Sequence, residues 1–446
     1  MNNESTQPEE YPKPTRGWFE RIGPGLITVC VVIGPGSVLT SSKTGAKYGF
    51  DMVWVVLVAV VFMLVYMTLG AKLGVVSGRS AGKLINEKAG RWLAVMVGLG
   101  VFLVSASFQF GNNLGIYSAF ATYIKPLENN QCLLEVKVIK LRLLFLFDAK
   151  VFTLGLMIGF NILTLFFLFG FRNLYSAMER LLTVFVAIML LAFAVNLFYA
   201  RPNLLEFVRG VIPDFSKKPD SSVLGLFGTT FVMASAYYQS YLVRQKGWGQ
   251  KELKVGLTDA RFAAGLMAVI TLMIMSTAAS ELRGKELTSV RVVAEQLNNP
   301  TFGEYGQLLF CIGLFSAAYS SFLINSMVGG FSLADGLGYP SEATDLPPRI
   351  FTAAVLLSGM GVAIYAAVNN LNPIVAIVMG QAVTVLVSPL LAGVLIWLTN
   401  CRSVMGNERS GFILNGLAAL GFLLILAMMG NTVLKGLVPN LQKLLK

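Results

Sequence analysis

Eleven stretches of this sequence are apolar over about 20 residues, the length that crosses a bilayer as a helix. In lipid every backbone N–H and C=O needs a partner, and a helix supplies these partners within one segment. The chain is therefore predicted to be an all-α polytopic membrane protein. The expected spans are 22–42, 51–76, 92–124, 151–170, 177–199, 223–245, 262–280, 305–334, 350–369, 371–398 and 411–434.

The composition agrees with a single transmembrane domain over 22–434 that contacts the lipid bilayer. Of the 446 residues 55% are hydrophobic and only 13% are charged, with a mean hydropathy of +0.69. Residues 1–21 and 435–446 are expected to be short polar tails. The first apolar stretch has neither the flanks nor the cleavage site of a signal peptide, so we expect the N-terminal tail to be retained.

Several classes of function are not expected. The four cysteines have no CxxC spacing, and the chain has no histidine, so neither a disulfide framework nor a metal cluster is predicted. We find no nucleophile with a base and no paired carboxylates, so we predict no enzyme, no cofactor and no nucleic-acid partner. The polar insert 125–150 is expected to lie along the membrane surface or to form a loop.

The first span is predicted to be broken at Ile33-Gly34-Pro35-Gly36-Ser37, because proline and glycine together interrupt a helix. Non-helical backbone at membrane depth is tolerated where it lines a cavity. We therefore place the substrate site at this break, with Gly34, Gly36, Ser37 and Thr40 as candidate binding residues.

A second interruption is predicted within 228–240 of the sixth span, where small and hydroxylated residues precede two tyrosines. Small residues in a membrane helix also favour close helix packing, and that reading remains open. Breaks five spans apart are typical of an inverted repeat with a site at the midplane. We expect 22–199 to form one repeat, 223–398 the inverted second repeat, and 411–434 an extra helix.

These residues resemble the NRAMP (natural resistance-associated macrophage protein) transporters, whose first span runs GPG and then DPGN. The matching motifs are Gly23-Pro24-Gly25, Gly34-Pro35-Gly36-Ser37, the Gly45 to Gly49 stretch, Gly313 to Ser321, Pro348-Arg349, and Gln381 with Pro389. The resemblance covers nearly the whole chain. It implies the LeuT-type fold with eleven helices, alternating access, and an inner (plasma) membrane location with a cytoplasmic N-terminus.

The sequence departs from that family where the metal binds. The resemblance would place the metal-binding Asp and Asn of DPGN at Gly34 and Ser37. In the sixth span it places Val232 at the family's Met and Ala234 at its His, although a one-residue shift would restore Met233. Neutral hydroxyl and carbonyl oxygens bind divalent cations poorly.

The sequence therefore leaves two classes of substrate open, a small anion and a divalent cation. Helix N-termini carry partial positive charge, so a break without a carboxylate favours a small anion such as bicarbonate, our preferred substrate. The alternative is a divalent cation, Mn²⁺, Fe²⁺ or Mg²⁺, held with Met233 and Gln381. Further candidate binding residues are Ala234, Ser235, Ala236, Tyr237, Tyr238, Gln239, Asn325 and Gln381, and Lys43 is expected to attract anions in a vestibule or to reach the surface.

The coupling ion, H⁺ or Na⁺, is also left open, and we expect a monomer. The acidic residues that we considered fall at the ends of spans: Asp51, Glu87, Asp148, Glu179, Asp259, Glu281 and Glu304. This placement argues against an ordinary proton or metal relay, although a relay from Glu179 or Asp259 at one mouth remains open. The hydroxyl cluster of Ser316, Ser320 and Ser321 could hold Na⁺ or serve packing.

Overall fold

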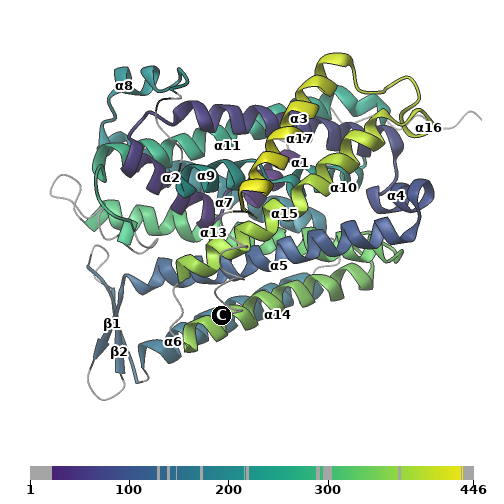
Figure 1. Ribbon diagram of the computed structural model, residues 1–446. Helices are drawn as coiled ribbons and strands as arrows, with labels where there is room; N and C mark the ends of the chain where they lie inside the picture. The colour runs from purple at the N-terminus through teal and green to yellow at the C-terminus, as the bar shows by residue number, and fades with distance from the viewer. Residues whose placement is uncertain are drawn as a thin grey trace, which may run out of the picture.

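The computed structural model describes residues 23–127, 131–137, 141–146, 148–170, 174–214, 216, 220–287, 292–294, 304–369, 373–432 and 434. Both predicted tails lie outside these residues. The long helices lie side by side (Figure 1), with α8 (Leu204–Arg209) and a small sheet at one end of the bundle, and α4 (Ala81–Ala89) and α16 (Arg402–Met405) at the other. We call these the sheet end and the α4 end.

The first span is broken, as predicted. Helix α1 (Pro24–Val32) and helix α2 (Pro35–Tyr48) meet at an angle of 61°. Pro35 is the first residue of α2, where its missing N–H costs no helical hydrogen bond. Within α1 or α2 the same proline would remove a bond and clash with the preceding turn, so the helix ends before it.

The other spans follow the predicted order. Their bounds are α3 (Val53–Ser77), α5 (Arg91–Ala121), α6 (Ala149–Gly170), α7 (Leu174–Ala200), α9 (Ser221–Thr230), α10 (Met233–Gln245), α11 (Leu253–Glu281), α13 (Glu304–Gly336), α14 (Leu346–Val368), α15 (Pro373–Asn400) and α17 (Phe412–Thr432). Among the described residues, nine helices are long and apolar enough to span a membrane, or ten if α1 and α2 count as one span. The pair of α9 and α10 is the eleventh predicted span.

The break between α9 and α10 falls at Phe231 and Val232, which are neither proline nor glycine. The hydroxyls of Thr229 and Thr230 bond to carbonyls three or four residues earlier, which weakens the last turn of a helix. The Phe231 ring packs against the ring of Tyr66 at 5.5 Å between centroids. Tertiary contacts therefore hold a break that has no strong local signal.

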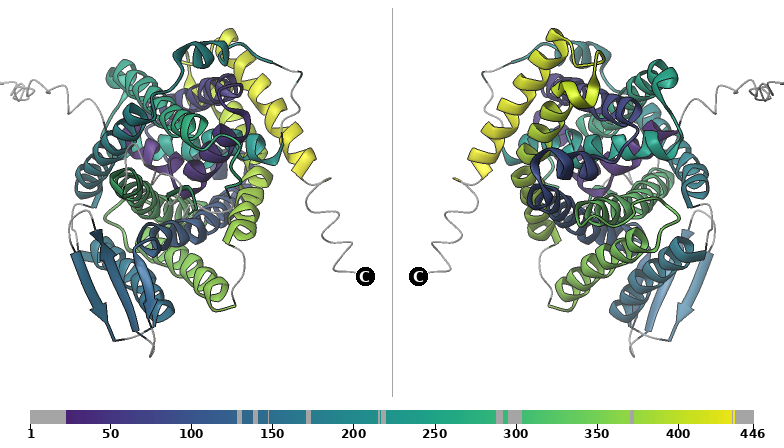
Figure 2. Two further views of the ribbon diagram at one scale, coloured as in Figure 1. Left: turned by 90° about the vertical axis from the view of Figure 1, so that its left-hand side faces the viewer. Right: turned by 90° about the vertical axis from the view of Figure 1, so that its right-hand side faces the viewer.

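The insert after α5, expected to lie along the membrane surface or to form a loop, contains regular β-structure. It forms an antiparallel sheet of β1 (Ile124–Leu127), β2 (Gln131–Val136) and β3 (Leu141–Phe145), in the order β1-β2-β3. Lys125 and Glu135 pair across β1 and β2, and Cys132 is buried. Figure 2 shows this sheet beside α6, outside the helical bundle. Pairing between strands satisfies the backbone groups of a segment that leaves the bilayer.

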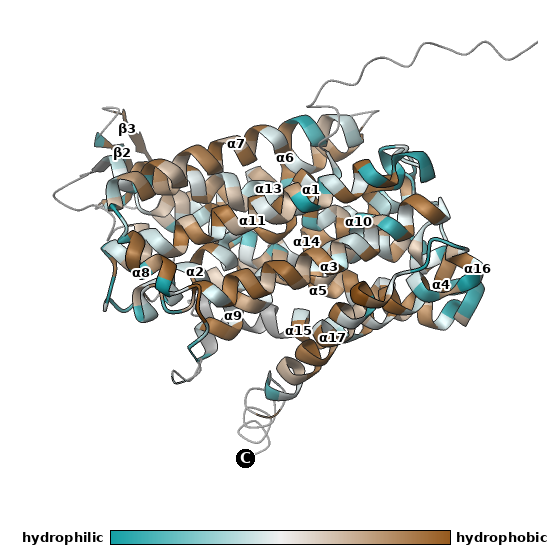
Figure 3. Ribbon diagram, turned by 90° about the horizontal axis from the view of Figure 1, so that it is seen from above, coloured by the Kyte–Doolittle hydropathy of each residue, from teal (hydrophilic) through white to brown (hydrophobic). Residues whose placement is uncertain are grey.

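Helix α13 lies at the centre of the bundle. Its most apolar window is 72% buried, compared with 17% for α17, whose surface faces outward. Glycines allow the close approach: a Cβ on Gly98 of α5 would lie 2.7 Å from the Ser332 carbonyl of α13. Hydrophobic residues cover the long outer helices and hydrophilic ones gather at the two ends (Figure 3). This distribution suits a bundle surrounded by lipid.

Candidate transport site

A small pocket lies at the first helix break. It is lined by Val31, Val32, Gly34, Pro35, Gly36 and Ser37 from α1 and α2, by Ser107, Phe108, Gly111 and Asn112 from α5, and by Ser321 from α13. Three of the predicted binding residues, Gly34, Gly36 and Ser37, therefore line one pocket. None of the lining side chains is charged.

The Ser37 hydroxyl is directed back across the break. It donates to the carbonyl of Val32 at 2.5 Å, so the lone pairs of its oxygen are left for a ligand. Thr40 lies one turn further along α2, donates to the Gly36 carbonyl, and meets the Thr229 hydroxyl of α9 at 3.1 Å. Thr40 thus joins α2 to α9 and is not among the residues that line this pocket.

Asn112 was not among the predicted site residues. Its Nδ2 donates to Gln109 Oε1 at 3.1 Å, while its Oδ1 would lie 3.4 Å from a Cβ built on Gly34. Sequence alone gives little signal here, because amides within apolar helices also serve helix packing. The Gln109-Phe110-Gly111-Asn112-Asn113 stretch is an unusual cluster of three amides within one span, and this density is the signal that was available.

Ser321 of α13 occupies the space beside Gly34. Its Oγ would be only 2.8 Å from a Cβ at that position. Asn325, a predicted site residue, donates to Ser321 Oγ at 2.8 Å and to the Val31 carbonyl at 3.4 Å. Asn325 therefore supports the pocket from behind.

The backbone N–H groups at the two breaks are partly used within the helices themselves. The Val38 N–H bonds to the Gly34 carbonyl and the Ala236 N–H to the Val232 carbonyl. Because both bonds close the first turn of a helix, these donors are used within α2 and α10. At the first break, the N–H groups of Gly36 and Ser37 precede the first closed turn of α2.

The predicted residues of the sixth span lie on α10 and are not among those that line the pocket at the first break. Met233, Ala234, Ser235, Ala236, Tyr237, Tyr238 and Gln239 are all buried. Gln239 Oε1 accepts from the Thr28 hydroxyl of α1 at 2.5 Å, and its Nε2 has no hydrogen-bond partner among the described residues. Gln381 belongs to α15 by its backbone, and its side chain lies outside the described residues.

Tyr237 and Tyr238 lead from the second break toward the α4 end. The Tyr237 hydroxyl lies 3.4 Å from that of Tyr241, and Tyr238 stacks on the Tyr241 ring. Tyr241 in turn donates to Asp335 of α13. Asp335, which we did not single out in the sequence, also accepts from the Ser80 hydroxyl at 2.6 Å.

Two buried carboxylates cap helix N-termini at the α4 end. Asp335 is 6% exposed and accepts from the Gly82 N–H of α4 at 2.7 Å. Asp259, expected at a span end, is 2% exposed within α11 and accepts from the N–H groups of Gly23 and Gly25 at 3.2 and 2.6 Å. A carboxylate at a helix N-terminus is favoured by unpaired N–H groups and the helix dipole.

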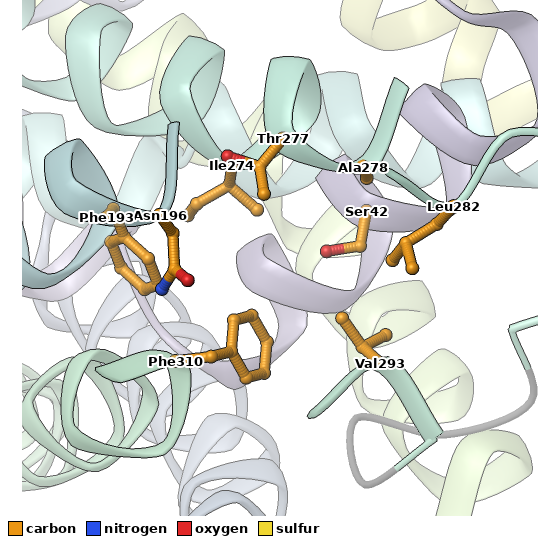
Figure 4. Close-up of a pocket in the computed structure, with 9 residues that line it drawn as sticks. All are labelled: Ser42, Phe193, Asn196, Ile274, Thr277, Ala278, Leu282, Val293 and Phe310. Atoms are coloured by element: carbon orange, nitrogen blue, oxygen red, sulfur yellow. The ribbon is translucent and has the colours of Figure 1, made fainter. Parts of the chain in front are cut away.

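A second pocket lies toward the sheet end. Figure 4 shows its lining residues: Ser42, Phe193, Asn196, Ile274, Thr277, Ala278, Leu282, Val293 and Phe310. Lys43, the predicted vestibule residue, follows Ser42 on α2, is half-buried, and interacts electrostatically with Asp220 and Glu286. A cation between two carboxylates attracts anions less than a free one.

Among the described residues, no group of three or more His, Cys, Asp or Glu side chains could hold a metal ion. The site instead offers neutral oxygens at a broken helix inside a membrane bundle. A fold and site of this kind define a membrane transporter whose substrate binds at a helix break.

The chain belongs to the natural resistance-associated macrophage protein-like (Nramp) family, whose model matches residues 25–435. Its relatives include the divalent metal cation transporter MntH of Deinococcus radiodurans, which is 24% identical over 407 residues covering 89% of this chain and 85% of that protein. MntH of Bacillus subtilis is 23% identical, with 88% and 86% covered. The protein is a transporter of this family and not an enzyme.

Solved structures confirm the fold. A mutant of the manganese transporter of Eremococcus coleocola has a TM-score of 0.77 at 16% identity, with 98% of this chain and 92% of that chain covered. MhsT in complex with L-phenylalanine has a TM-score of 0.58 at 15% identity, with 91% and 98% covered. The predicted LeuT-type architecture with two broken helices is therefore confirmed.

Proposed function

We propose that this Nramp-family protein moves a divalent metal cation by alternating access, with the cation bound at the break between α1 and α2. The proposal rests on the direction of two hydrogen bonds. Ser37 donates its O–H to the Val32 carbonyl, and Asn112 donates an N–H to Gln109. Both side chains therefore turn acceptor oxygens toward the pocket, and oxygen acceptors are what a hard cation requires.

The relatives support the same choice. Those named above are called divalent metal cation transporters, which favours a cation over the bicarbonate preferred from the sequence. Because no charged side chain lines the pocket, the cation must keep much of its hydration shell. Mg²⁺ and Mn²⁺, which favour oxygen ligands, suit this site better than ions that prefer sulfur or imidazole.

A small oxyanion such as bicarbonate is the second candidate, and one observation favours it. Helix α2 begins at the break with no side-chain cap and no acidic residue in its first turn. The N–H groups of Gly36 and Ser37 are thus available to an anion, and the helix dipole favours negative charge there.

The deciding experiment is flux into proteoliposomes at a set membrane potential. Vesicles carry a divalent-sensitive dye or a pH dye, and Mn²⁺, Mg²⁺ or bicarbonate is added outside. We expect saturable Mn²⁺ or Mg²⁺ uptake that empty vesicles lack, and imposed pH or Na⁺ gradients then identify the coupling ion. Bicarbonate flux without divalent uptake, measured with a carbonic anhydrase inhibitor present, would overturn the cation proposal in favour of the anion.

A further inference from the structure

We propose that Gln109 of α5 is a positioning residue for transport: it holds the Asn112 amide so that the amide oxygen faces the substrate. This inference rests on the proposed function, since it concerns an acceptor offered to a cation. Gln109 is 0% exposed and is not among the residues that line the pocket, so it acts through Asn112.

The two amides form a chain of hydrogen bonds in which every donor points the same way. Gln109 Nε2 donates to the Phe322 carbonyl of α13 at 2.6 Å, and Gln109 Oε1 accepts from Asn112 Nδ2 at 3.1 Å. The spacing of three residues places both amides on one side of α5. This chain of hydrogen bonds begins at a backbone carbonyl, which can only accept. The amides of Gln109 and Asn112 must therefore each point their oxygen toward the pocket.

Packing fixes the first member of the chain. Gly359 of α14 lies against Gln109, and a Cβ on Gly359 would be 2.3 Å from the Gln109 Cβ. Helices α13 and α14 thus confine the Gln109 side chain on two sides. A rotated Gln109 amide would face the Phe322 carbonyl with its own oxygen and lose a buried hydrogen bond, which is costly away from water.

The direction of the chain matters at its last member. An unanchored Asn112 amide could turn its NH₂ group toward the pocket, and a donor there repels a cation. With Gln109 in place, that rotation would bring the oxygens of Asn112 and Gln109 together. Gln109 therefore selects for cations without contacting one.

A neighbouring pair of amides supplies a matched control. Asn113 donates to the Gln109 backbone carbonyl at 2.8 Å and accepts from Asn161 Nδ2 of α6 at 2.9 Å. Asn161 is similarly buried, at 1% exposed, and its Nδ2 donates to Asn113 and to the Met157 carbonyl rather than to Asn112. Removing the Asn161 amide thus tests the loss of a buried hydrogen bond without changing the acceptor at the pocket.

The test compares Mn²⁺ uptake by Gln109→Met, Asn112→Ala and the double variant in proteoliposomes. We expect Gln109→Met to raise KM for Mn²⁺ about tenfold, or about 1.4 kcal/mol, with the maximal rate changed less than threefold. In the Asn112→Ala background the same substitution should leave KM unchanged, because its effect passes through Asn112. Asn161→Leu should change KM less than twofold.

A conservative variant covers the case in which Gln109→Met fails to fold. Gln109→Glu keeps an oxygen for the Asn112 N–H, so its KM should not rise. Three results would each overturn the positioning role while leaving divalent transport in place. They are a raised KM in Gln109→Glu, an unchanged KM in Gln109→Met, and a rise in KM on Gln109→Met that is equal with Asn112 and with Asn112→Ala. Absence of divalent uptake by the unaltered protein would overturn the proposed function, and this inference with it.

Discussion

At the scale of single residues, the shape of the pocket at the first break depends on Gly34, because Ser321 fills the space where a side chain at position 34 would lie. Gly34 has φ of −136° and ψ of −175°, an extended conformation that any residue can adopt. Space, rather than backbone strain, therefore limits a side chain at this position: the Ser321 Oγ would lie 2.8 Å from its Cβ. The substitution Ser321→Ala removes that oxygen and makes room for a larger residue at position 34.

The first prediction is that Gly34→Asp combined with Ser321→Ala strengthens divalent binding. A carboxylate near the cation adds attraction of about 4 kcal/mol per unit of charge at 4 Å and an effective dielectric constant near 20, before desolvation. We expect KM for Mn²⁺ to fall at least tenfold, measured by uptake into proteoliposomes. Ser321→Ala alone is the control for the lost bond from Asn325 and should not lower KM. A KM that rises in the double variant would mean that no cation binds beside Gly34.

At this scale the position of the break could be predicted from the sequence, whereas its polar neighbours could not. The break was predictable because the Gly34-Pro35-Gly36 sequence interrupts a helix for local reasons. Asn112 and Asp335 were not found, because how α5 and α13 pack decides which polar side chain meets the break and which caps α4. That packing is tertiary structure, which the local sequence pattern does not contain.

At the scale of elements, hydroxyl hydrogen bonds join the half-helices in pairs. Thr28 of α1 donates to Gln239 of α10, and Thr40 of α2 meets Thr229 of α9. Each pair contains one half of each broken span. We infer that α1 moves with α10 and α2 moves with α9 when the site changes sides.

The second prediction is that the two hydrogen bonds, Thr28–Gln239 and Thr40–Thr229, contribute differently to the free energy of unfolding. Thr28→Val leaves both polar atoms of the buried Gln239 amide without a partner, since its Nε2 already has none among the described residues. Thr40→Val leaves Thr229 its bond to the Gly225 carbonyl. We expect a loss of about 1–3 kcal/mol for Thr28→Val and less than about 1 kcal/mol for Thr40→Val, measured by denaturant unfolding in detergent micelles. Equal losses would contradict this difference.

The third prediction concerns the attachment of α4. Asp335 accepts from Ser80, Gly82 and Tyr241, so it joins α4 and α10 to α13. Asp335→Ala should cost about 3 kcal/mol in thermal or denaturant unfolding, because several buried donors lose a charged acceptor. Tyr241→Phe removes one donor only and should cost clearly less. If Tyr241→Phe costs as much as Asp335→Ala, the capping of α4 contributes little.

At the scale of the whole molecule, the order and number of the spans were predictable. Apolar length predicted eleven spans, because every span must cross the same thickness of lipid, and among the described residues ten of them, with α1 and α2 counted as one, are helices long and apolar enough to do so. The sheet was missed because its strands are four to six residues long and leave the bilayer, where that constraint no longer applies. The break at Phe231 was located only approximately, since aromatic packing rather than proline or glycine holds it.

The fourth prediction tests the cytoplasmic N-terminus that the sequence resemblance implies, which would place the α4 end in the cytoplasm because α1 begins there. Cys401 lies between α15 and α16 and is partly exposed, whereas Cys30, Cys132 and Cys311 are buried. A hydrogen bond with the Ser403 hydroxyl lowers the pKa of the Cys401 thiol, so more thiolate is present at neutral pH and alkylation is faster. A membrane-impermeant maleimide should label inside-out vesicles and spare intact cells.

Two controls accompany the labelling experiment. Cys401→Ser should abolish the signal, and Ser403→Ala should slow labelling at neutral pH while leaving its sidedness unchanged. Labelling of intact cells at Cys401 would place the α4 end outside and reverse the orientation that we propose.

The hydrogen bonds Thr28–Gln239 and Thr40–Thr229 make each half of the chain depend on the other. A polypeptide ending after α8 would contain Thr28 and Thr40 but neither Gln239 nor Thr229. Neither half of the chain could therefore form these two contacts alone, and the two broken spans are joined only where both halves are present.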